Sequence, residues 1–292
     1  WKKDWFIGVA VTCLLLAARP THLIQSLERA AYDWGVRTSS RTPSDKVVVI
    51  AIDDASIRNI GRWPWSREIH AKMTEGLANA KAKVIGNIVF FSEPQVDAGF
   101  GYIGKLLEVY TKLVPAPPEG APPPAVSPEM AQIGAMLREA EVSLNTDRRL
   151  AEAYGKAGNV LLPMLFELGE PRGKPDKPFP EFITKNQLTS IDKTVSDEFP
   201  LPASAVISLP IEGIAKTALA IGHLNSNADV DGGIRAEPLV VQFFDQMYPS
   251  MSTMLAAESL NLGVGDIKVR LGDGVKVGNL RIGTDPSLQM YT

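Results

Sequence analysis

An unbroken apolar run, mostly β-branched, extends from Val47 to Ile52 and stops abruptly at Asp53 and Asp54. A strand that is buried on both faces of a parallel sheet has this pattern, because each face then needs apolar side chains. The run therefore predicts a central parallel strand.

A helix and a second strand are predicted directly after this run. Ser66 can cap the helix, and a second apolar run extends from Val84 to Phe91. The apolar positions of the helix recur at four- and three-residue spacing: Ile69, Met73, Leu77 and Ala80. Because a strand, a crossover helix and a parallel strand close in the right-handed sense, we expect the two strands to be adjacent and parallel.

The rest of the pattern extends this unit to an α/β fold with a mostly parallel, mixed sheet and helices on both faces. Further strands are predicted at residues 160–166, 221–224, 234–244 and 288–291, and a helix at 250–262. The turn Gly272-Asp273-Gly274 lies between two short apolar runs and predicts a β-hairpin addition near the carboxyl end. Residues 170–201 show little periodicity and predict a surface excursion.

Residues from about 95 to 146 have the pattern of a proline-rich insertion. Helices are predicted at 102–113 and at 128–154, separated by prolines at 115–124. Since proline removes the backbone donors that helices and ladders need, this middle part predicts an exposed polyproline-like loop.

The amino-terminal end carries an apolar run from Trp5 to Ala18, which is short for a bilayer core of about 30 Å. The run is compatible with a signal peptide, a buried core helix or a truncated membrane helix. We favour a membrane helix over residues 1–20, with Lys2 and Lys3 indicating a cytoplasmic amino end. Pro20 would then interrupt the connection to the next helix.

A helix with one apolar stripe is predicted at residues 21–37, where Leu23, Leu27 and Trp34 share a face. The stripe commonly packs on its own domain, which is the interpretation that the pattern alone favours. The alternative is that it pairs with a second copy of the chain in a homodimer and carries a signal.

Composition excludes several classes of protein. The chain has 292 residues, 45% of them hydrophobic, and a formal charge of −3, so it folds and offers no electrostatic footprint for nucleic acid. Its single cysteine, Cys13, allows no intramolecular disulfide and no cysteine metal site.

Candidate binding residues gather after the first predicted strand. Asp53 and Asp54 follow that strand directly, and Glu93 follows the second one. Between them, Trp63, Trp65 and Arg67 lie just beyond the carboxyl end of a parallel strand, where open α/β sheets bind ligands. These six residues are the ligand-binding candidates at this edge, although the tryptophans can equally be plugs that seal it.

The motif search predicts no catalytic residue, no metal and no cofactor. The chain has no P-loop, no nucleophile elbow and no glycine-rich dinucleotide fingerprint, and its three histidines lie far apart. The carboxylates Asp53, Asp54 and Glu93 leave a metal-dependent hydrolase as the weakest alternative.

The same residues resemble a known family, the second type of CHASE domain, a sensor module of bacterial membrane-bound signalling proteins. The matching segments are Ile52-Asp53-Asp54-Ala55-Ser56, Gly61-Arg62-Trp63-Pro64-Trp65-Ser66-Arg67-Glu68-Ile69-His70-Ala71 and Phe91-Ser92-Glu93-Pro94. The helix Glu28 to Asp33 resembles the family's membrane-proximal helix, and Asp229 to Arg235 resembles its D-x-D-G-x-x-R turn, which adds Asp231 to the ligand-binding candidates.

Two features depart from that resemblance. Asn87 stands where the family pattern has an aspartate, so the charge of that aspartate is missing. The long insertion separates Glu93-Pro94 from Asp147-Arg148-Arg149-Leu150-Ala151, which resembles a segment that normally follows closely.

The resemblance implies an extracytoplasmic sensor region, residues 21–292, in the periplasm or outside the cell and anchored by the amino-terminal helix. It implies an unknown small-molecule or protein stimulus and a cytoplasmic cyclase or kinase output that this chain lacks, and the stripe of the 21–37 helix adds a homodimer to these expectations. The main alternative is a membrane-anchored structural or binding subunit of an envelope complex.

Overall fold

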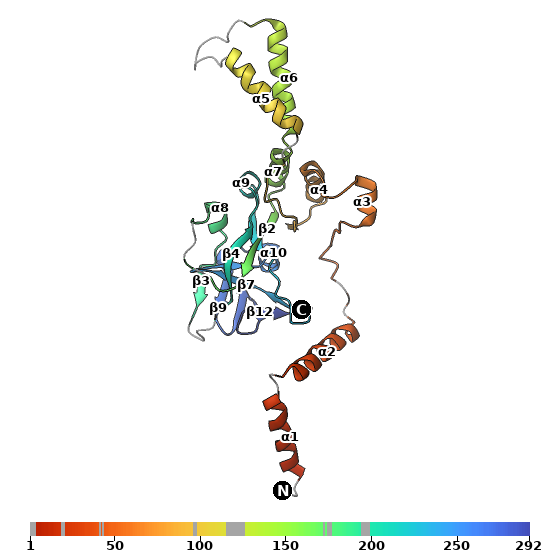
Figure 1. Ribbon diagram of the computed structural model, residues 1–292, viewed down its shortest axis with the longest axis vertical. Helices are drawn as coiled ribbons and strands as arrows, with labels where there is room; N and C mark the ends of the chain where they lie inside the picture. The colour runs from red at the N-terminus through yellow and green to blue at the C-terminus, as the bar shows by residue number, and fades with distance from the viewer. Residues whose placement is uncertain are drawn as a thin grey trace. The chain divides into compact units, whose positions relative to one another are not determined.

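The computed structural model describes residues 4–18, 21–40, 42, 44–95, 98–114, 126–171, 173, 177–193 and 199–292. The chain divides into two compact units, Trp1–Gly61 and Arg62–Thr292. Figure 1 shows the elements of each unit with their labels. The predicted kink at Pro20 and the predicted proline-rich loop at 115–124 lie outside the described residues.

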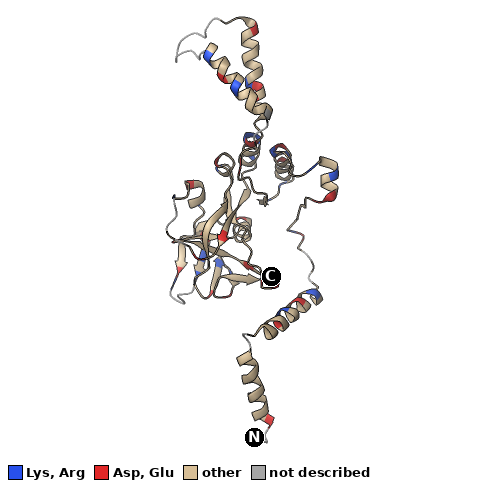
Figure 2. Cartoon of the chain, viewed as in Figure 1, with Lys and Arg blue, Asp and Glu red and all other residues tan. Residues whose placement is uncertain are grey.

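The described residues of the first unit form the helices α1 (Asp4–Ala18), α2 (His22–Thr38) and α3 (Asp54–Ile60). From Trp5 to Ala18, α1 carries no charged residue, as Figure 2 shows. Among the described residues, no single helix combines the length and the apolar character that a bilayer crossing requires. The expected membrane helix over residues 1–20 is therefore not confirmed.

The run from Val47 to Ile52 is extended but is not a strand, so the prediction of a central parallel strand is wrong. Val47, Val48 and Val49 are 72%, 80% and 86% exposed. The predicted pairing with the 84–91 strand is therefore not observed either. An apolar β-branched run needs a hydrogen-bonded neighbour and two covering layers to form a buried strand, and its sequence specifies neither.

The second unit is built on a six-stranded mixed sheet with the order β1-β2-β4-β7-β8, in which β5 also pairs with β2. Its strands are β1 (Ile85–Gly86), β2 (Val160–Leu168), β4 (Leu201–Ser208), β5 (Ala220–His223), β7 (Val240–Phe243) and β8 (Gln246–Pro249). The amino half of β2 runs parallel to β1 and β5, and its carboxyl half is antiparallel to β4. The β4–β7 pair is parallel and the β7–β8 pair antiparallel, so the sheet is mixed as predicted.

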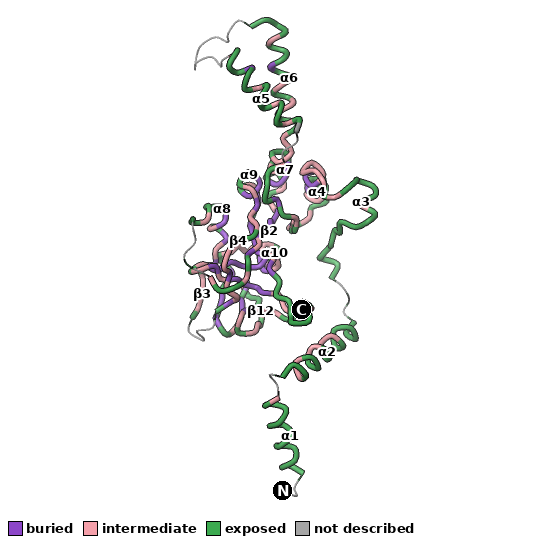
Figure 3. The backbone as a smooth tube through the Cα atoms, in the orientation of Figure 1, coloured by how far each residue is buried: buried purple, intermediate pink, exposed green. Residues whose placement is uncertain are grey.

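The two faces of this sheet belong to different cores. Leu162 and Met164 of β2 pack in the core that contains Leu150 and Tyr154 of α7 (Thr146–Ala157). Leu161 packs in the other core, with the methionines of α10 (Met251–Ser259). Because successive strand residues point to opposite faces, α7 and α10 cover opposite faces of the sheet. The buried parts of the tube in Figure 3 follow these strands and helices.

A second sheet of four strands has the order β11-β10-β9-β3 and packs in the α10 core. Its strands are β3 (Ser190–Asp192), β9 (Ile267–Arg270), β10 (Gly274–Val277) and β11 (Leu280–Gly283). The antiparallel β9–β10 hairpin confirms the prediction around Gly272-Asp273-Gly274. A third pair joins β6 (Ala236–Pro238) with β12 (Gln289–Tyr291), and the remaining short helices are α8 (Glu181–Thr184), α9 (Glu212–Ala215) and η1 (Val264–Asp266).

The insertion contains the helices α5 (Ala98–Leu113) and α6 (Pro128–Leu144), which pack against each other. The close approach requires Gly134, because a Cβ atom there would lie within 2.2 Å of the Tyr110 ring. The single helix predicted at 128–154 is broken at Asn145, which ends α6 and caps α7 by accepting from the backbone N–H of Arg148.

Three further predictions need correction. The buried face of α4 (Arg67–Asn79) is His70, Ala71 and Thr74, whereas Met73 of the predicted face is exposed. Residues 170–201 are not only a surface excursion, because this stretch contributes buried side chains, Phe182, Ile183 and Leu188. The strand predicted at 234–244 is divided into β6 and β7, which belong to different sheets.

Candidate functional site

Arg67 is the first residue of α4, and it joins three segments that are distant in sequence. Ser66 caps the helix by accepting from the backbone N–H of Glu68, which fixes the position of Arg67. The Arg67 Nη2 donates to the carbonyl oxygen of Glu93 at 2.8 Å, and its Nε lies 3.2 Å from Asp147 Oδ1. The Arg67 guanidinium therefore links the start of α4, the segment after β1 and the first turn of α7.

The ion pair between Arg67 and Asp147 is largely shielded from solvent. The two side chains are 16% and 18% exposed, and the contact is an electrostatic one rather than an aligned hydrogen bond. Partial burial lowers solvent screening, so removing either partner should cost more than breaking a surface pair, because the other charge is left shielded from water.

The backbone around Gln95 closes the base of the insertion. The backbone N–H of Gln95 donates to Asp147 Oδ2 at 2.8 Å, and Thr146 Oγ1 donates to Gln95 Oε1 at 3.0 Å. The same amide oxygen accepts from the backbone N–H of Arg67 at 2.7 Å. The residues on either side of the insertion are thus in direct contact, although about fifty positions separate them.

An aromatic group covers the other side of Arg67. The guanidinium lies over the Phe91 ring, 4.7 Å from its centroid, and His70 packs edge-on against the same ring at 5.2 Å. Trp63 contacts both His70 and Trp65, with ring centroids 5.8 and 5.3 Å apart. Both tryptophans are half-buried, so each is partly covered by the domain and partly accessible to solvent.

His70 is held neutral by this environment. Burial lowers the pKa of His70 from its ordinary value, and the positive charge of Arg67 lowers it further. Its Nδ1 has no hydrogen-bond partner among the described residues. The imidazole therefore acts here as a packing ring between Trp63 and Phe91.

Asn87 stands where the family pattern has an aspartate, and both the nitrogen and the oxygen of its side-chain amide are hydrogen-bonded. Its Nδ2 donates to the hydroxyl of Tyr154, and its Oδ1 accepts from the backbone N–H of Val89 at 2.8 Å. Burial raises the pKa of Tyr154, so the hydroxyl stays protonated. A neutral amide thus donates to the buried hydroxyl without placing a carboxylate beside it.

The structure brings together some of the candidate ligand-binding residues. Trp63, Trp65 and Arg67 form one cluster with the backbone of Glu93, whose side chain is exposed. Sequence reasoning did not assign Gln95 or Asp147 to this site. Asp147 could have been found from the family pattern, because it begins the D-x-x-L-A segment. The insertion separates this segment from Glu93 along the chain, so its proximity to Arg67 was not evident.

The remaining candidate residues lie elsewhere. Asp53 caps α3, accepting from the backbone N–H and hydroxyl of Ser56 at 2.8 and 2.6 Å, and these hydrogen bonds lower the pKa of Asp53. Asp54 is the first residue of α3. Both belong to the first unit, so their expected proximity to Glu93 stays a prediction.

Asp231 belongs to a separate turn between β5 and β6. Arg235 is bound by Asp231 at 2.9 Å and by Asp229 at 2.7 Å, and Asp231 Oδ1 also accepts from the backbone N–H of Gly233. The D-x-D-G-x-x-R motif is therefore an internally paired turn. Within the described part of the chain, no group of three or more His, Cys, Asp and Glu side chains is placed to hold a metal ion.

The fold and this site define a class of protein: a mixed α/β domain whose motif residues join the start of α4 to the segment after β1 and to the start of α7. The family model of the CHASE2 domain matches residues 7–291, so the chain belongs to the CHASE2 domain family. CHASE2 domains are sensor domains of signalling proteins, typically extracytoplasmic parts of membrane proteins. No curated protein and no solved structure matches the chain.

Proposed function

We propose that this chain is the extracytoplasmic sensor domain of a bacterial transmembrane receptor. The observation that carries the proposal is the CHASE2 match over residues 7–291, in which the family's motif residues converge on Arg67. In this function the domain detects a small-molecule or protein stimulus and regulates a cytoplasmic cyclase or kinase that lies outside the chain. The domain itself performs no catalysis.

The proposal places the main domain in the periplasm or outside the cell, with an anchor in the cytoplasmic membrane. The support for the anchor is α1, which runs uncharged from Trp5 to Ala18. The charge pattern of the preceding lysines at positions 2 and 3 favours a cytoplasmic amino end.

A topology experiment tests this placement. The natural protein is truncated after Thr292 and fused to one of two reporters. Alkaline phosphatase is active only outside the cytoplasm. Green fluorescent protein fluoresces only in the cytoplasm, because it does not become fluorescent after export by the general secretion route. We expect an active phosphatase and a dark fluorescent fusion. The reverse pattern would overturn the extracytoplasmic assignment.

A signalling experiment tests the role. The intact natural protein carrying Arg67→Met is compared with the unmodified protein for the activity of its output domain in membranes. We expect altered output with unchanged membrane level, because the substitution removes the ion pair that joins the start of α4 to the start of α7. A natural protein without a cyclase or kinase domain would instead support a structural or binding subunit of an envelope complex.

A further inference from the structure

The outer face of the second sheet carries a row of cations. Lys276 of β10 lies directly opposite Lys268 of β9 on one side and Arg281 of β11 on the other. All three side chains are exposed, and neither lysine has a carboxylate partner in the described chain. Like charges directly opposite each other on neighbouring strands destabilise a sheet, so the row has an energetic cost in the absence of a bound anion.

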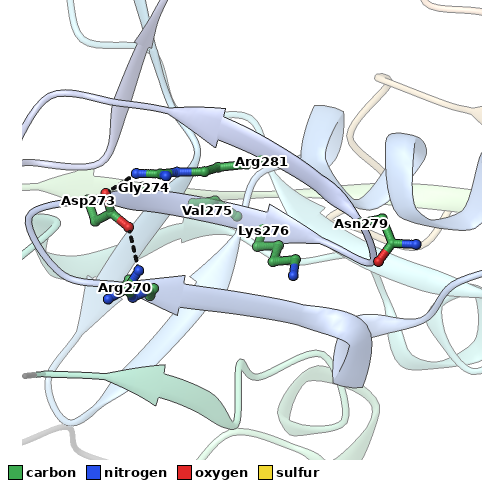
Figure 4. Close-up of a pocket in the computed structure, with 7 residues that line it drawn as sticks. All are labelled: Arg270, Asp273, Gly274, Val275, Lys276, Asn279 and Arg281. Carbon is green, nitrogen blue, oxygen red and sulfur yellow. Dashed lines mark hydrogen bonds and ion pairs between the residues drawn. The ribbon is translucent and has the colours of Figure 1, made fainter.

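A pocket lies over the same strands. It has a volume of about 290 Å³, and Figure 4 shows the side chains around it. The lining residues are Arg270, Asp273, Gly274, Val275, Lys276, Asn279 and Arg281. Three cations against one carboxylate give this pocket a net positive charge.

Asp273 positions the two arginines at one end of the pocket. It accepts from Arg270 Nη1 at 2.9 Å and also binds Arg281, and Asp192 Oδ2 lies 3.4 Å from the Arg270 Nε. Each guanidinium keeps further N–H donors beyond these contacts. The turn requires Gly274, with φ of 136°, because a Cβ atom would lie 2.3 Å from the Ile282 carbonyl oxygen.

The floor of the pocket is rigid. The alternate residues of β9 and β10, among them Val269, Val275 and Val277, are buried in the core below α10. The packed strands fix the backbone positions from which the three cations project, and Asp273 further restrains the two arginines, which lowers the cost of ordering the site when an anion binds.

We propose that this pocket binds a small molecule with a compact anionic group, such as a phosphate or a carboxylate. Lys276 supplies a point charge in the centre, Arg270 and Arg281 supply planar donors at one end, and Asn279 supplies an amide at the other. Planar guanidiniums match phosphate and carboxylate oxygens in geometry, and each charge-assisted hydrogen bond is stronger than a neutral one. Binding does not depend on the proposed receptor role, whereas its use as a stimulus does.

Calorimetric titration of the intact chain with inorganic phosphate and, separately, with succinate tests the proposal. We expect saturable binding with a dissociation constant of about 1 mM or lower, weakened by salt. Lys276→Gln should weaken binding about tenfold, the loss of one charge-assisted hydrogen bond, and Lys276→Arg should retain most of it. The matched control, Lys112→Gln in α5, removes an exposed lysine elsewhere and should bind as the unmodified chain does.

Two outcomes would overturn the proposal. One is the absence of saturable binding by either anion, and the other is equal binding by Lys276→Gln and the unmodified chain. Sedimentation with phosphatidylglycerol vesicles separates the possible sources of the anionic group, with neutral phosphatidylcholine vesicles as the reference for any binding through α1. Vesicle binding that is lost in Lys276→Gln, without binding of the free anions, would identify a lipid surface and contradict the small-molecule ligand.

Discussion

At the scale of single residues, Arg67 explains why several short motifs occur together in one chain. Its backbone N–H donates to Gln95, and its guanidinium pairs with Asp147 and lies over the Phe91 ring. None of these contacts is local in sequence, so each motif alone has no evident structural reason. Together they fix where α4 and α7 start relative to the end of β1.

The ion pair gives a prediction about stability. Arg67→Met and Asp147→Asn should each lower the free energy of unfolding by about 2–3 kcal/mol, because each leaves the other group shielded and poorly paired. Denaturant unfolding of both variants and of the double variant measures the coupling energy.

The exposed pair Arg148–Glu152 on the same helix is the control, since its side chains are 53% and 52% exposed. Arg148→Met should change the free energy of unfolding by about 0.5 kcal/mol or less. A loss of stability in Arg67→Met no larger than that in Arg148→Met would mean that the contacts of Arg67 do not hold the domain together.

His223 gives a prediction about pH. Burial lowers its pKa to about 3 from an unperturbed 6.5; its Nδ1 accepts from the backbone N–H of Asn225, and its Nε2 has no partner among the described residues. The unfolded chain therefore binds the proton more readily than the folded one, so stability is present above pH 6.5 and falls as the pH decreases towards 3. From pH 7.5 to pH 5 this single group should cost about 2 kcal/mol.

Denaturant unfolding at both pH values measures this effect. His223→Gln and His223→Leu should each reduce the loss between pH 7.5 and pH 5 by about 2 kcal/mol, whatever their stability at pH 7.5. His22→Gln, at an exposed position of α2, should leave the loss unchanged. An identical pH dependence in all of these variants would show that His223 is not buried in its neutral form.

At the scale of elements, the features that depend on one turn of chain were predictable. The Ser66 cap, the β9–β10 hairpin and the α10 helix follow from local rules, because each involves neighbours in sequence. The packing partner of a helix, and the point at which a helix ends, could not be predicted in this way. The buried face of α4 is set by α7, and the break at Asn145 by the cap that the asparagine provides. Periodicity alone therefore placed Leu77 correctly against the core, but it placed Met73 on the buried face and missed the break.

The run from Val47 to Ile52 shows the same limit more strongly. Its pattern is that of a strand, yet the structure leaves it exposed, as Figure 3 shows. A six-residue run with high β-propensity, no charge and no proline tends to associate with other strands. We therefore expect self-association of the chain to rise with concentration.

Val48→Lys combined with Val49→Lys should reduce that association, measured by light scattering, and should leave the melting midpoint unchanged. The reason is that both side chains are more than three-quarters exposed, so charged replacements lose no packing. Lys46→Ala with Ser44→Ala, just before the run, serves as the comparison. A clearly lower melting midpoint in the lysine variant would show that the run is packed as a strand in solution, as its pattern predicts.

At the scale of the whole molecule, the insertion leaves the architecture of the second unit intact. Gln95 before it and Thr146 after it are hydrogen-bonded to each other, so the chain returns to the point at which it left. Helices α5 and α6 pack mainly with each other. The contact between Gln95 and Asp147 could not be predicted from the sequence, because the two residues are far apart along the chain and only the fold brings them together.

Signalling requires an element with two arrangements that reaches the membrane, because a stimulus shifts an equilibrium only through its different affinities for two states. The candidate is α2, which follows α1 in the chain. Leu23, Leu27 and Trp34 on one side of α2 are 68%, 58% and 71% exposed. We propose that two copies of the chain associate through this stripe and that a stimulus changes how the two helices cross.

Leu23→Glu combined with Leu27→Glu should abolish dimer formation by the intact natural protein, measured by cross-linking in membranes, since two added charges on each helix would face each other. The melting transition of the α/β unit should persist, because neither leucine is buried in the structure. Gln25→Glu combined with Val36→Glu places the same added charge on the opposite side of α2 and should leave the dimer intact. Dimers that survive the leucine substitutions, or an α/β unit that unfolds with them, would refute signalling through this stripe.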